Sequence, residues 1–186
     1  MKLCVVGTHG TGKTTLTYQI ASEFKKRGRN ATVINEVARR CPFPINDGFD
    51  TEGAEWIITS QINRELQAKA DGYDDIICDR SAYDPICYLK CVEKPIKYWQ
   101  KLAAYAEEWL KTYDKIIFVI PSGKELVNDG IRSMDIDFQQ NVHEQFSCFF
   151  KGQTYMKIIP KDRIHQVQSS EIFKNYFEDI YKCIFQ

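Results

Sequence analysis

The fold is decided by the stretch Gly7-Thr8-His9-Gly10-Thr11-Gly12-Lys13-Thr14, which matches the pattern G-x-x-x-x-G-K-[ST]. The apolar run Lys2–Val6 before it predicts a strand, and apolar residues at helical spacing over Lys13–Lys26 predict a helix after it. Glycines let the backbone N–H groups of such a loop point at phosphate oxygens, and the start of the helix adds a favourable dipole. The sequence therefore predicts a phosphate-binding loop between a strand and a helix.

This loop has the side chains needed to bind a nucleoside triphosphate. Lys13 brings a mobile positive charge to the β- and γ-phosphates, and the Thr14 hydroxyl can bind Mg²⁺. His9 occupies a variable position of the pattern. We expect ATP and Mg²⁺ as cofactors, with the nucleotide held by Gly7, Thr8, His9, Gly10, Thr11, Gly12, Lys13, Thr14 and Thr15.

Strands and helices alternate along the rest of the chain. Strands that are apolar throughout are typical of a parallel sheet covered on both faces, so we expect a doubly wound α/β fold. Ligands of such folds bind beyond the carboxyl ends of the strands. The further strands are expected at Ala31–Ile34, Asp75–Cys78, Lys115–Ile120 and Tyr155–Ile159, and the further helices at about Glu52–Ala70, Tyr83–Val92, Pro95–Thr112, Ile136–Lys151 and Ser170–Ile184.

Length and composition favour one domain over residues 1–186. The chain has 44% hydrophobic and 27% charged residues, as in ordinary globular proteins. Its 25 Lys and Arg balance 25 Asp and Glu, which disfavours a surface that grips nucleic acid broadly. No apolar run approaches the about 20 residues of a membrane span, and the seven cysteines are scattered, so we expect a cytoplasmic protein with reduced thiols and no membrane contact.

Two carboxylates are expected at the active edge of the sheet. Asp79 ends the third strand, where it could hold Mg²⁺ through water or accept a proton from an attacking hydroxyl, and Arg80 follows it. Glu36 lies just beyond the second strand, and Arg39 behind it suits an anionic acceptor. The residues alone leave open which carboxylate is the general base.

The segment Pro121–Arg132 has the glycines and charges of a mobile cover. Within it, Lys124 and Arg132 could swing onto a transferring phosphate. We therefore expect a lid at about residues 121–135.

Aromatic side chains near the acceptor segments are candidates for stacking on a base. Phe43, Trp56, Tyr83 and Tyr88 lie in or near these segments, although each of them could instead belong to the core. Gln61, close to the face of Trp56, could pair with a base edge. The candidate substrate-binding residues from this pattern are Arg39, Trp56, Gln61 and Tyr83.

These motifs resemble those of the P-loop nucleoside and nucleotide kinases, the superfamily that includes deoxynucleoside kinases, thymidylate kinase and nicotinamide riboside kinase. More narrowly, the chain is similar to small ATPase-like kinase domains of the nicotinamide riboside kinase type, and the likeness spans most of its length. The motifs that carry it are Gly7–Thr14, Glu36–Arg39, Trp56, Gln61, Glu65, Asp79–Ser81, Asp84 and Asp129–Arg132.

The resemblance implies a five-stranded parallel sheet in the order 2-3-1-4-5, with the acceptor above the second and third strands. It implies that Asp79 or Glu36 is the general base, that Arg80 and Arg132 steady the phosphates, and that Lys161–Arg163 lies near the adenine. It also adds Asp84 to the substrate site, while the metal site expected from the residues is Thr14 and Asp79.

Three functions remain open at this point. The first is an ATP- and Mg²⁺-dependent kinase that phosphorylates a nucleoside, a nucleoside monophosphate or a related small molecule. The second is the same chemistry on a hydroxyl of DNA or RNA or of a modified base, helped by a strip of Lys90, Lys94, Lys97 and Lys101. The third is an ATPase or nucleotide switch that acts on a partner protein. The sequence leaves the oligomeric state open, a homodimer included.

Overall fold

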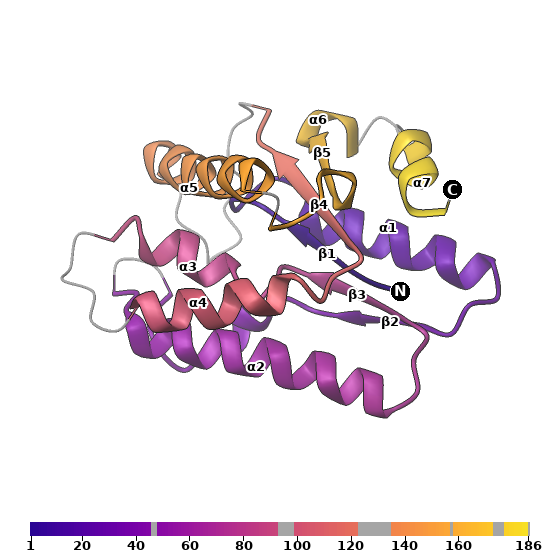
Figure 1. Cartoon of the computed structure of the whole chain (residues 1–186), viewed down its shortest axis with the longest axis horizontal. Helices are drawn as coiled ribbons and strands as arrows, with labels where there is room; N and C mark the ends of the chain where they lie inside the picture. Colours follow the sequence, from indigo (N-terminus) through magenta and orange to yellow (C-terminus); the bar gives the residue numbers. More distant parts are fainter. Residues whose placement is uncertain (46–47, 93–98, 123–134, 157, 173–176, 186) are drawn as a thin grey trace.

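Five parallel strands form the centre of the structure. The computed structural model describes residues 1–45, 48–92, 99–122, 135–156, 158–172 and 177–185 (Figure 1). The sheet has the order β2-β3-β1-β4-β5, which confirms the 2-3-1-4-5 order that the resemblance implied. The strands are β1 (Lys2–Val6), β2 (Ala31–Ile34), β3 (Asp75–Asp79), β4 (Lys115–Ile120) and β5 (Ile164–Gln168).

Helices cover both faces of this sheet (Figure 1). Alternate residues of β1 show the two layers, because Cys4 and Val6 pack into one apolar cluster and Leu3 and Val5 into another. The first cluster includes residues of α2 to α5, and the second includes residues of α1 and α7. The helices are α1 (Lys13–Lys26), α2 (Thr51–Ala70), α3 (Asp84–Leu89), α4 (Trp99–Leu110), α5 (Ile136–Tyr155), α6 (Ser169–Ile172) and α7 (Phe177–Phe185), with the short 3₁₀ turns η1 (Val37–Arg40) and η2 (Lys161–Arg163).

The fifth strand differs from the prediction. The segment Tyr155–Ile159 is not a strand, because α5 continues to Tyr155 and Ile159 is buried beside the sheet without pairing. The true strand, Ile164–Gln168, reads Ile-His-Gln-Val-Gln and buries only Val167 fully. Among the described residues it pairs with β4 alone, at the edge of the sheet, so it needs less apolar surface than a central strand.

This shift overturns one further expectation. Residues Lys161–Arg163 come before β5 rather than after a strand, so they lie at the amino ends of the strands. There Arg163 donates to the carbonyl of Lys111 at 3.2 Å, just before β4 begins. The expectation that this segment lies near the adenine is therefore wrong, because the nucleotide loop is at the opposite, carboxyl edge.

Two other expectations concern the long segments. The helix expected over Ser170–Ile184 is two helices, α6 and α7, with residues 173–176 between them outside the described part. The predicted lid at about 121–135, including Arg132, lies almost wholly outside the described residues, as do Lys94 and Lys97. In the part of the chain that the structure describes, no helix is long and apolar enough to cross a membrane.

The turn from β1 into the phosphate-binding loop requires glycine at position 7. Gly7 has a φ of 133°, which an L side chain rarely adopts, and a Cβ placed there would lie 2.6 Å from the carbonyl oxygen of Val119 in β4. Because that oxygen belongs to a buried strand of the same sheet, the contact cannot be relieved by moving a flexible side chain.

We therefore expect Gly7→Ala to lower the free energy of unfolding by at least about 2 kcal/mol, measured by urea denaturation. Gly152→Ala is the matched control, since Gly152 lies in α5 with nothing within 4 Å of its added Cβ. That change should leave stability unchanged or raise it by up to about 1 kcal/mol. Equal effects of the two substitutions would contradict this account of the loop.

Candidate active site

The phosphate-binding loop joins β1 to α1 and leaves the start of that helix open. Gly10 and Gly12 adopt positive φ angles of 70° and 81°, and no side chain caps the N-terminus of α1. The first backbone N–H groups of the helix are therefore available to an anion. Lys13 folds back over the loop, where its ammonium group donates to the carbonyl of Thr8 and lies 3.4 Å from the Thr11 hydroxyl.

The two residues predicted to bind a metal meet at this loop. The Thr14 hydroxyl donates to Asp79 Oδ2 at 2.6 Å, because β3 lies beside β1 and places Asp79 opposite Val5. A hydroxyl and a carboxylate are hard oxygen ligands that suit Mg²⁺, which is usually bound by one or two protein oxygens together with substrate phosphates. No group of three or more His, Cys, Asp or Glu that could hold a metal occurs among the described residues.

Arg80 connects the carboxyl ends of three strands. Its φ of 85° is the one positive value among the described non-glycine residues, and it follows directly after β3. The guanidinium group donates to Glu36 after β2, to Asp84 Oδ2 at 3.2 Å at the start of α3, and to the carbonyl of Gly7 at 3.3 Å after β1. Only 8% of Arg80 is exposed, so these partners replace water around a buried charge.

The surroundings keep Arg80 positively charged. Burial acts to lower the pKa of Arg80, but Glu36, Asp84 and Asp79 outweigh it, so the pKa is raised well above its ordinary value. Tyr88 packs its ring 5.3 Å from the guanidinium carbon, and burial raises the pKa of its phenol, which therefore stays neutral.

Asp84 is fixed by hydrogen bonds from the segment before it. Its Oδ1 accepts from the Ser81 amide at 2.9 Å and from the Ser81 hydroxyl at 2.7 Å, while Oδ2 accepts from Arg80. Asp84 thus positions Arg80 and the turn at the end of β3.

Glu36 and Asp79 occupy different parts of the site. Glu36 accepts from Arg80 and also from Arg39 Nε at 3.0 Å, and it lines a pocket next to the phosphate-binding loop. Asp79 does not line that pocket and instead holds Thr14. The sequence alone did not distinguish the positions of these two carboxylates. Their different neighbours in the structure do distinguish them.

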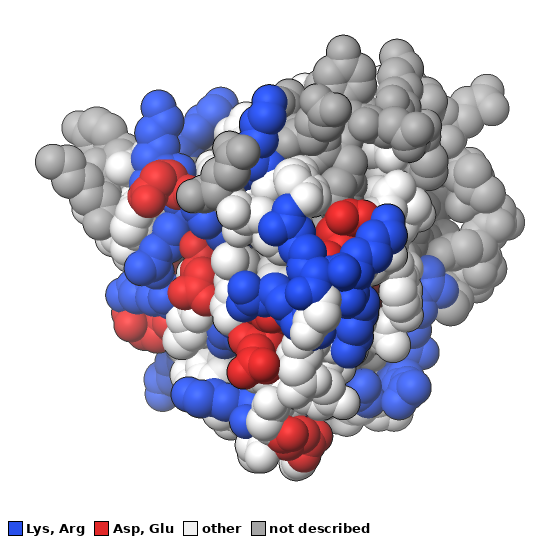
Figure 2. Space-filling view, turned by 90° about the vertical axis from the view of Figure 1, so that its right-hand side faces the viewer, with Lys and Arg blue, Asp and Glu red and all other residues white. Residues whose placement is uncertain are grey.

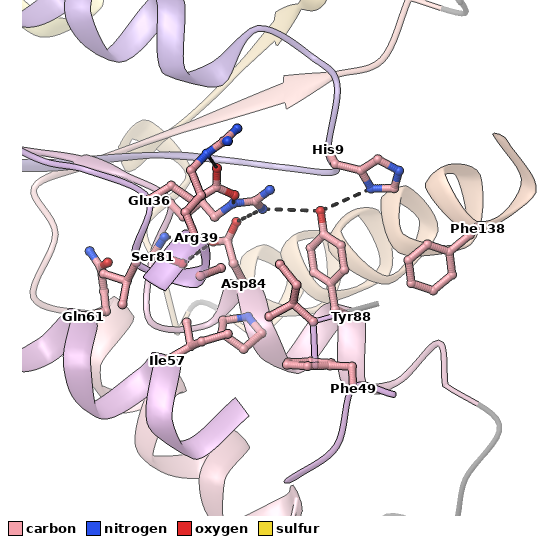
Figure 3. Close-up of a pocket in the computed structure, with 15 residues that line it drawn as sticks. His9, Glu36, Arg39, Phe49, Ile57, Gln61, Ser81, Asp84, Tyr88 and Phe138 are labelled. Atoms are coloured by element: carbon pink, nitrogen blue, oxygen red, sulfur yellow. Dashed lines mark hydrogen bonds and ion pairs between the residues drawn. The ribbon is translucent and has the colours of Figure 1, made fainter. Parts of the chain in front are cut away.

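The pocket combines charged groups on one side with apolar side chains on the other (Figure 3). Tyr88 lies in its middle, with its hydroxyl 3.4 Å from His9 Nδ1 and 3.4 Å from Arg80. His9 therefore faces this pocket, and its ring centroid lies 6.0 Å from that of Phe138. The lining residues are His9, Glu36, Val37, Ala38, Arg39, Ile45, Phe49, Ile57, Gln61, Arg80, Ser81, Asp84, Pro85, Tyr88 and Phe138.

The structure brings three of the predicted substrate residues, Arg39, Gln61 and Asp84, to this pocket, but not the other two. Tyr83 is 3% exposed and stacks on Phe149 with ring centroids 3.8 Å apart. Trp56 packs against the apolar cluster that contains the pocket-wall residues Phe49 and Ile57, but it does not line the pocket itself. These two side chains therefore belong to the packing of the helices.

Sequence reasoning missed the apolar wall of the pocket formed by Phe49, Ile57 and Phe138. Phe49 precedes Asp50, which caps α2 by accepting from the Gly53 amide, and Phe138 lies in the first turn of α5. Phe49 and Phe138 each lie beside the start of a predicted helix, and this position was the signal that the sequence offered. Their apolar character does not distinguish them from residues of the core.

This arrangement defines the fold of the protein. A parallel sheet in the order 2-3-1-4-5, with a phosphate-binding loop after its first strand, matches the P-loop kinase fold. A family model described as "AAA domain" matches residues 2–166, most of the chain, and the chain belongs to that family.

Solved structures agree with this fold. Deoxyadenosine kinase from M. mycoides with bound dATP is 17% identical, with a TM-score of 0.70 and coverage of 100% of both chains. A second structure of that enzyme, with the products dCMP and a flexible dCDP, is 17% identical, with a TM-score of 0.66 and coverage of 99% of this chain and 98% of that one. A comparison with curated proteins finds no significant match.

Removing the buried cation should destabilise the protein strongly. We expect Arg80→Met to lower the free energy of unfolding by about 3–5 kcal/mol at pH 7, because Glu36 and Asp84 lose their buried partner. Unpaired carboxylates have raised pKa values in the folded state, so the deficit should shrink as the pH falls from 7 to 5. Urea denaturation at both pH values measures it.

Arg39→Met is the matched control for this experiment. Arg39 pairs with the same carboxylate, Glu36, but its side chain is 39% exposed. Its loss should cost less than about 1 kcal/mol and show little dependence on pH. A similar effect of both substitutions would mean that burial does not set the contribution of Arg80.

Proposed function

We propose that this protein is an ATP- and Mg²⁺-dependent kinase that transfers the γ-phosphate to a hydroxyl of a nucleoside, a nucleoside monophosphate or a related small molecule. The observation that carries the proposal is the pocket beside the phosphate-binding loop, in which a carboxylate, Glu36, faces a space walled by aromatic rings. Arg80 contacts both Glu36 and the carbonyl of Gly7, so loop and pocket share one hydrogen-bond network.

In this proposal the loop binds ATP. Lys13 would exchange its contact with the Thr8 carbonyl for the β- and γ-phosphates, and the uncapped N–H groups at the start of α1 would also hold phosphate oxygens. Thr14 and Asp79 would hold Mg²⁺, which when bound supplies positive charge to the phosphates. The remaining loop residues Thr8, His9, Gly10, Thr11 and Thr15 complete the nucleotide site.

Glu36 is the proposed general base. Its carboxylate accepts the proton of the attacking hydroxyl, while Arg80 and Arg39 hold it in place and offer positive charge to the acceptor. Arg132 remains a proposed lid residue that would steady the transferred phosphate, although it lies outside the described residues.

The apolar wall suits a flat heterocycle. Phe49, Tyr88 and Phe138 provide rings for packing, and Gln61 lies at the end of the pocket on α2 (Figure 3). An acceptor that carries a base agrees with the ligands named for the deoxyadenosine kinase structures. Gln61 is therefore the proposed contact to the base edge.

The alternative acceptors remain as outcomes of a test. Figure 2 shows the face at the amino ends of the strands, where Lys and Arg gather in the middle with Asp and Glu among them. Such mixed charge gives little support for phosphate-backbone binding on that face.

Transfer of labelled γ-phosphate from ATP to nucleosides, nucleoside monophosphates, nicotinamide riboside, DNA and RNA distinguishes the acceptors. Release of free phosphate without transfer to any acceptor would contradict the proposal and favour an ATPase.

Substitution of the two carboxylates should separate their roles. Glu36→Gln should lower kcat by about 10²–10⁴-fold at saturating Mg²⁺, because the base is lost. Asp79→Asn should instead raise the Mg²⁺ concentration needed for half-maximal rate, measured by titration with the metal. Lys13→Ala, which should abolish transfer while the far-ultraviolet circular dichroism is retained, provides the inactive reference. An unchanged kcat in Glu36→Gln would remove Glu36 from the role of base.

A further inference from the structure

Two buried hydrogen bonds hold the phosphate-binding loop against the start of α5. The Thr8 hydroxyl donates to the backbone carbonyl of Gln139 at 3.0 Å, and Gln139 Nε2 donates to the carbonyl of His9 at 2.7 Å. Thr8 is fully buried, and His9 and Gln139 are 3% and 7% exposed, so water does not compete for these bonds. Figure 3 shows His9 at this contact, with Phe138 of α5 facing it. The loop thus takes part of its shape from a residue 130 positions further along the chain.

Successive peptide groups of the loop face different ways. The carbonyl of Thr8 accepts from the Thr11 hydroxyl at 3.1 Å and from the Lys13 ammonium, so it faces into the loop. The carbonyl of His9 accepts from the amide on α5, so it faces that helix. No cis peptide bond occurs among the described residues, and in a planar trans peptide the C=O and the following N–H point in opposite directions. The N–H of Gly10 is therefore turned away from α5.

The Gly10 N–H is placed to receive a ligand. Gly10 is exposed, and no described residue accepts a hydrogen bond from its amide. Its φ of 70° is a left-handed conformation, and such a residue lets neighbouring N–H groups form an anion-binding concavity. Gly12, two residues further on, precedes the uncapped first N–H groups of α1. The Gly10 amide thus extends the set of donors that α1 offers to an anion.

We propose that Gln139 is a positioning residue of the nucleotide site, which holds the His9 carbonyl so that the Gly10 N–H is presented to the triphosphate. The inference rests on the proposed function and deepens it, because it assigns to the phosphate site a residue outside the glycine motif. Without the Gln139 amide, the buried His9 carbonyl loses this donor, and its peptide group is no longer held in one direction. The Gly10 N–H then has to be reoriented when a phosphate binds, which weakens binding.

Gln139→Met tests this role, because it removes the amide and keeps the length of the side chain. The Thr8 hydroxyl can still donate to the backbone carbonyl at position 139, so the loop stays attached to α5. We expect the Kd for ATP and the Kd for inorganic pyrophosphate, each measured with Mg²⁺ by calorimetry, to rise about tenfold, as for the loss of one hydrogen bond to a charged group. If Gln139→Met does not fold, Gln139→Leu takes its place.

The amide proton of Gly10 gives a readout that a general loosening of the fold would not. In the wild-type protein, saturating Mg²⁺-pyrophosphate should move this proton downfield in a nitrogen–proton correlation spectrum, because a hydrogen bond to an anion deshields it. In Gln139→Met the downfield shift at saturation should be smaller. Either a shift or a Kd equal to the wild-type value in the folded variant overturns the role of Gln139.

Gln153→Met is the matched control. Gln153 also lies in α5 and is 3% exposed, but its Nε2 donates to Glu107 Oε1 of α4 at 2.5 Å rather than to the loop. Its replacement should lower the melting temperature and leave both Kd values and the Gly10 shift unchanged. Equal weakening of binding by the two substitutions would mean that the general stability of α5, rather than the His9 carbonyl, controls the loop.

The outcomes separate the role of Gln139 from the proposed function. If the wild-type protein binds neither ATP nor pyrophosphate, the nucleotide site is contradicted, and the role of Gln139 is overturned with it. If the wild-type protein binds both and Gln139→Met binds them equally well, only the role of Gln139 is overturned. The transfer assay with the wider set of acceptors decides independently whether the protein is a kinase.

Discussion

The hydrogen bonds of Arg80 hold the candidate site together. One guanidinium group bridges Glu36 after β2, the Gly7 carbonyl after β1 and Asp84 at the start of α3. The left-handed backbone at Arg80 turns the chain at the end of β3, and the surrounding acceptors compensate for its unfavourable conformation. Because these partners come from separate segments, the loop, the pocket and α3 take their relative positions from one buried cation.

Sheet order then gives the two carboxylates different positions in the site. Neighbouring strands lie about 4.8 Å apart, so a residue at the end of β3 is one strand from the phosphate-binding loop and a residue after β2 is two strands away. Asp79 consequently reaches Thr14, while Glu36 is left to face the pocket. The sequence contained both carboxylates but not their distances from the loop, which depend on long-range pairing of strands.

Local signals were sufficient for much of the fold and for part of the site. The glycine spacing of Gly7–Thr14 and the apolar strands next to it identified the loop, and the resemblance supplied the strand order. The fifth strand was missed because an edge strand is half polar, whereas the apolar Ile159 packs without pairing. Tyr83 and Phe138 show the remaining limit, since an aromatic residue has the same pattern whether it lines a pocket or fills a core.

The polar character of β5 has a consequence for the behaviour of the protein at high concentration. The outermost strand of an open sheet presents unpaired backbone groups that can recruit a strand of another molecule. His165, Gln166 and Gln168 surround the single fully buried Val167, so this strand offers little apolar surface to such a partner. The polar residues that hid the strand from sequence reasoning thus also limit the apolar surface at this edge of the described sheet.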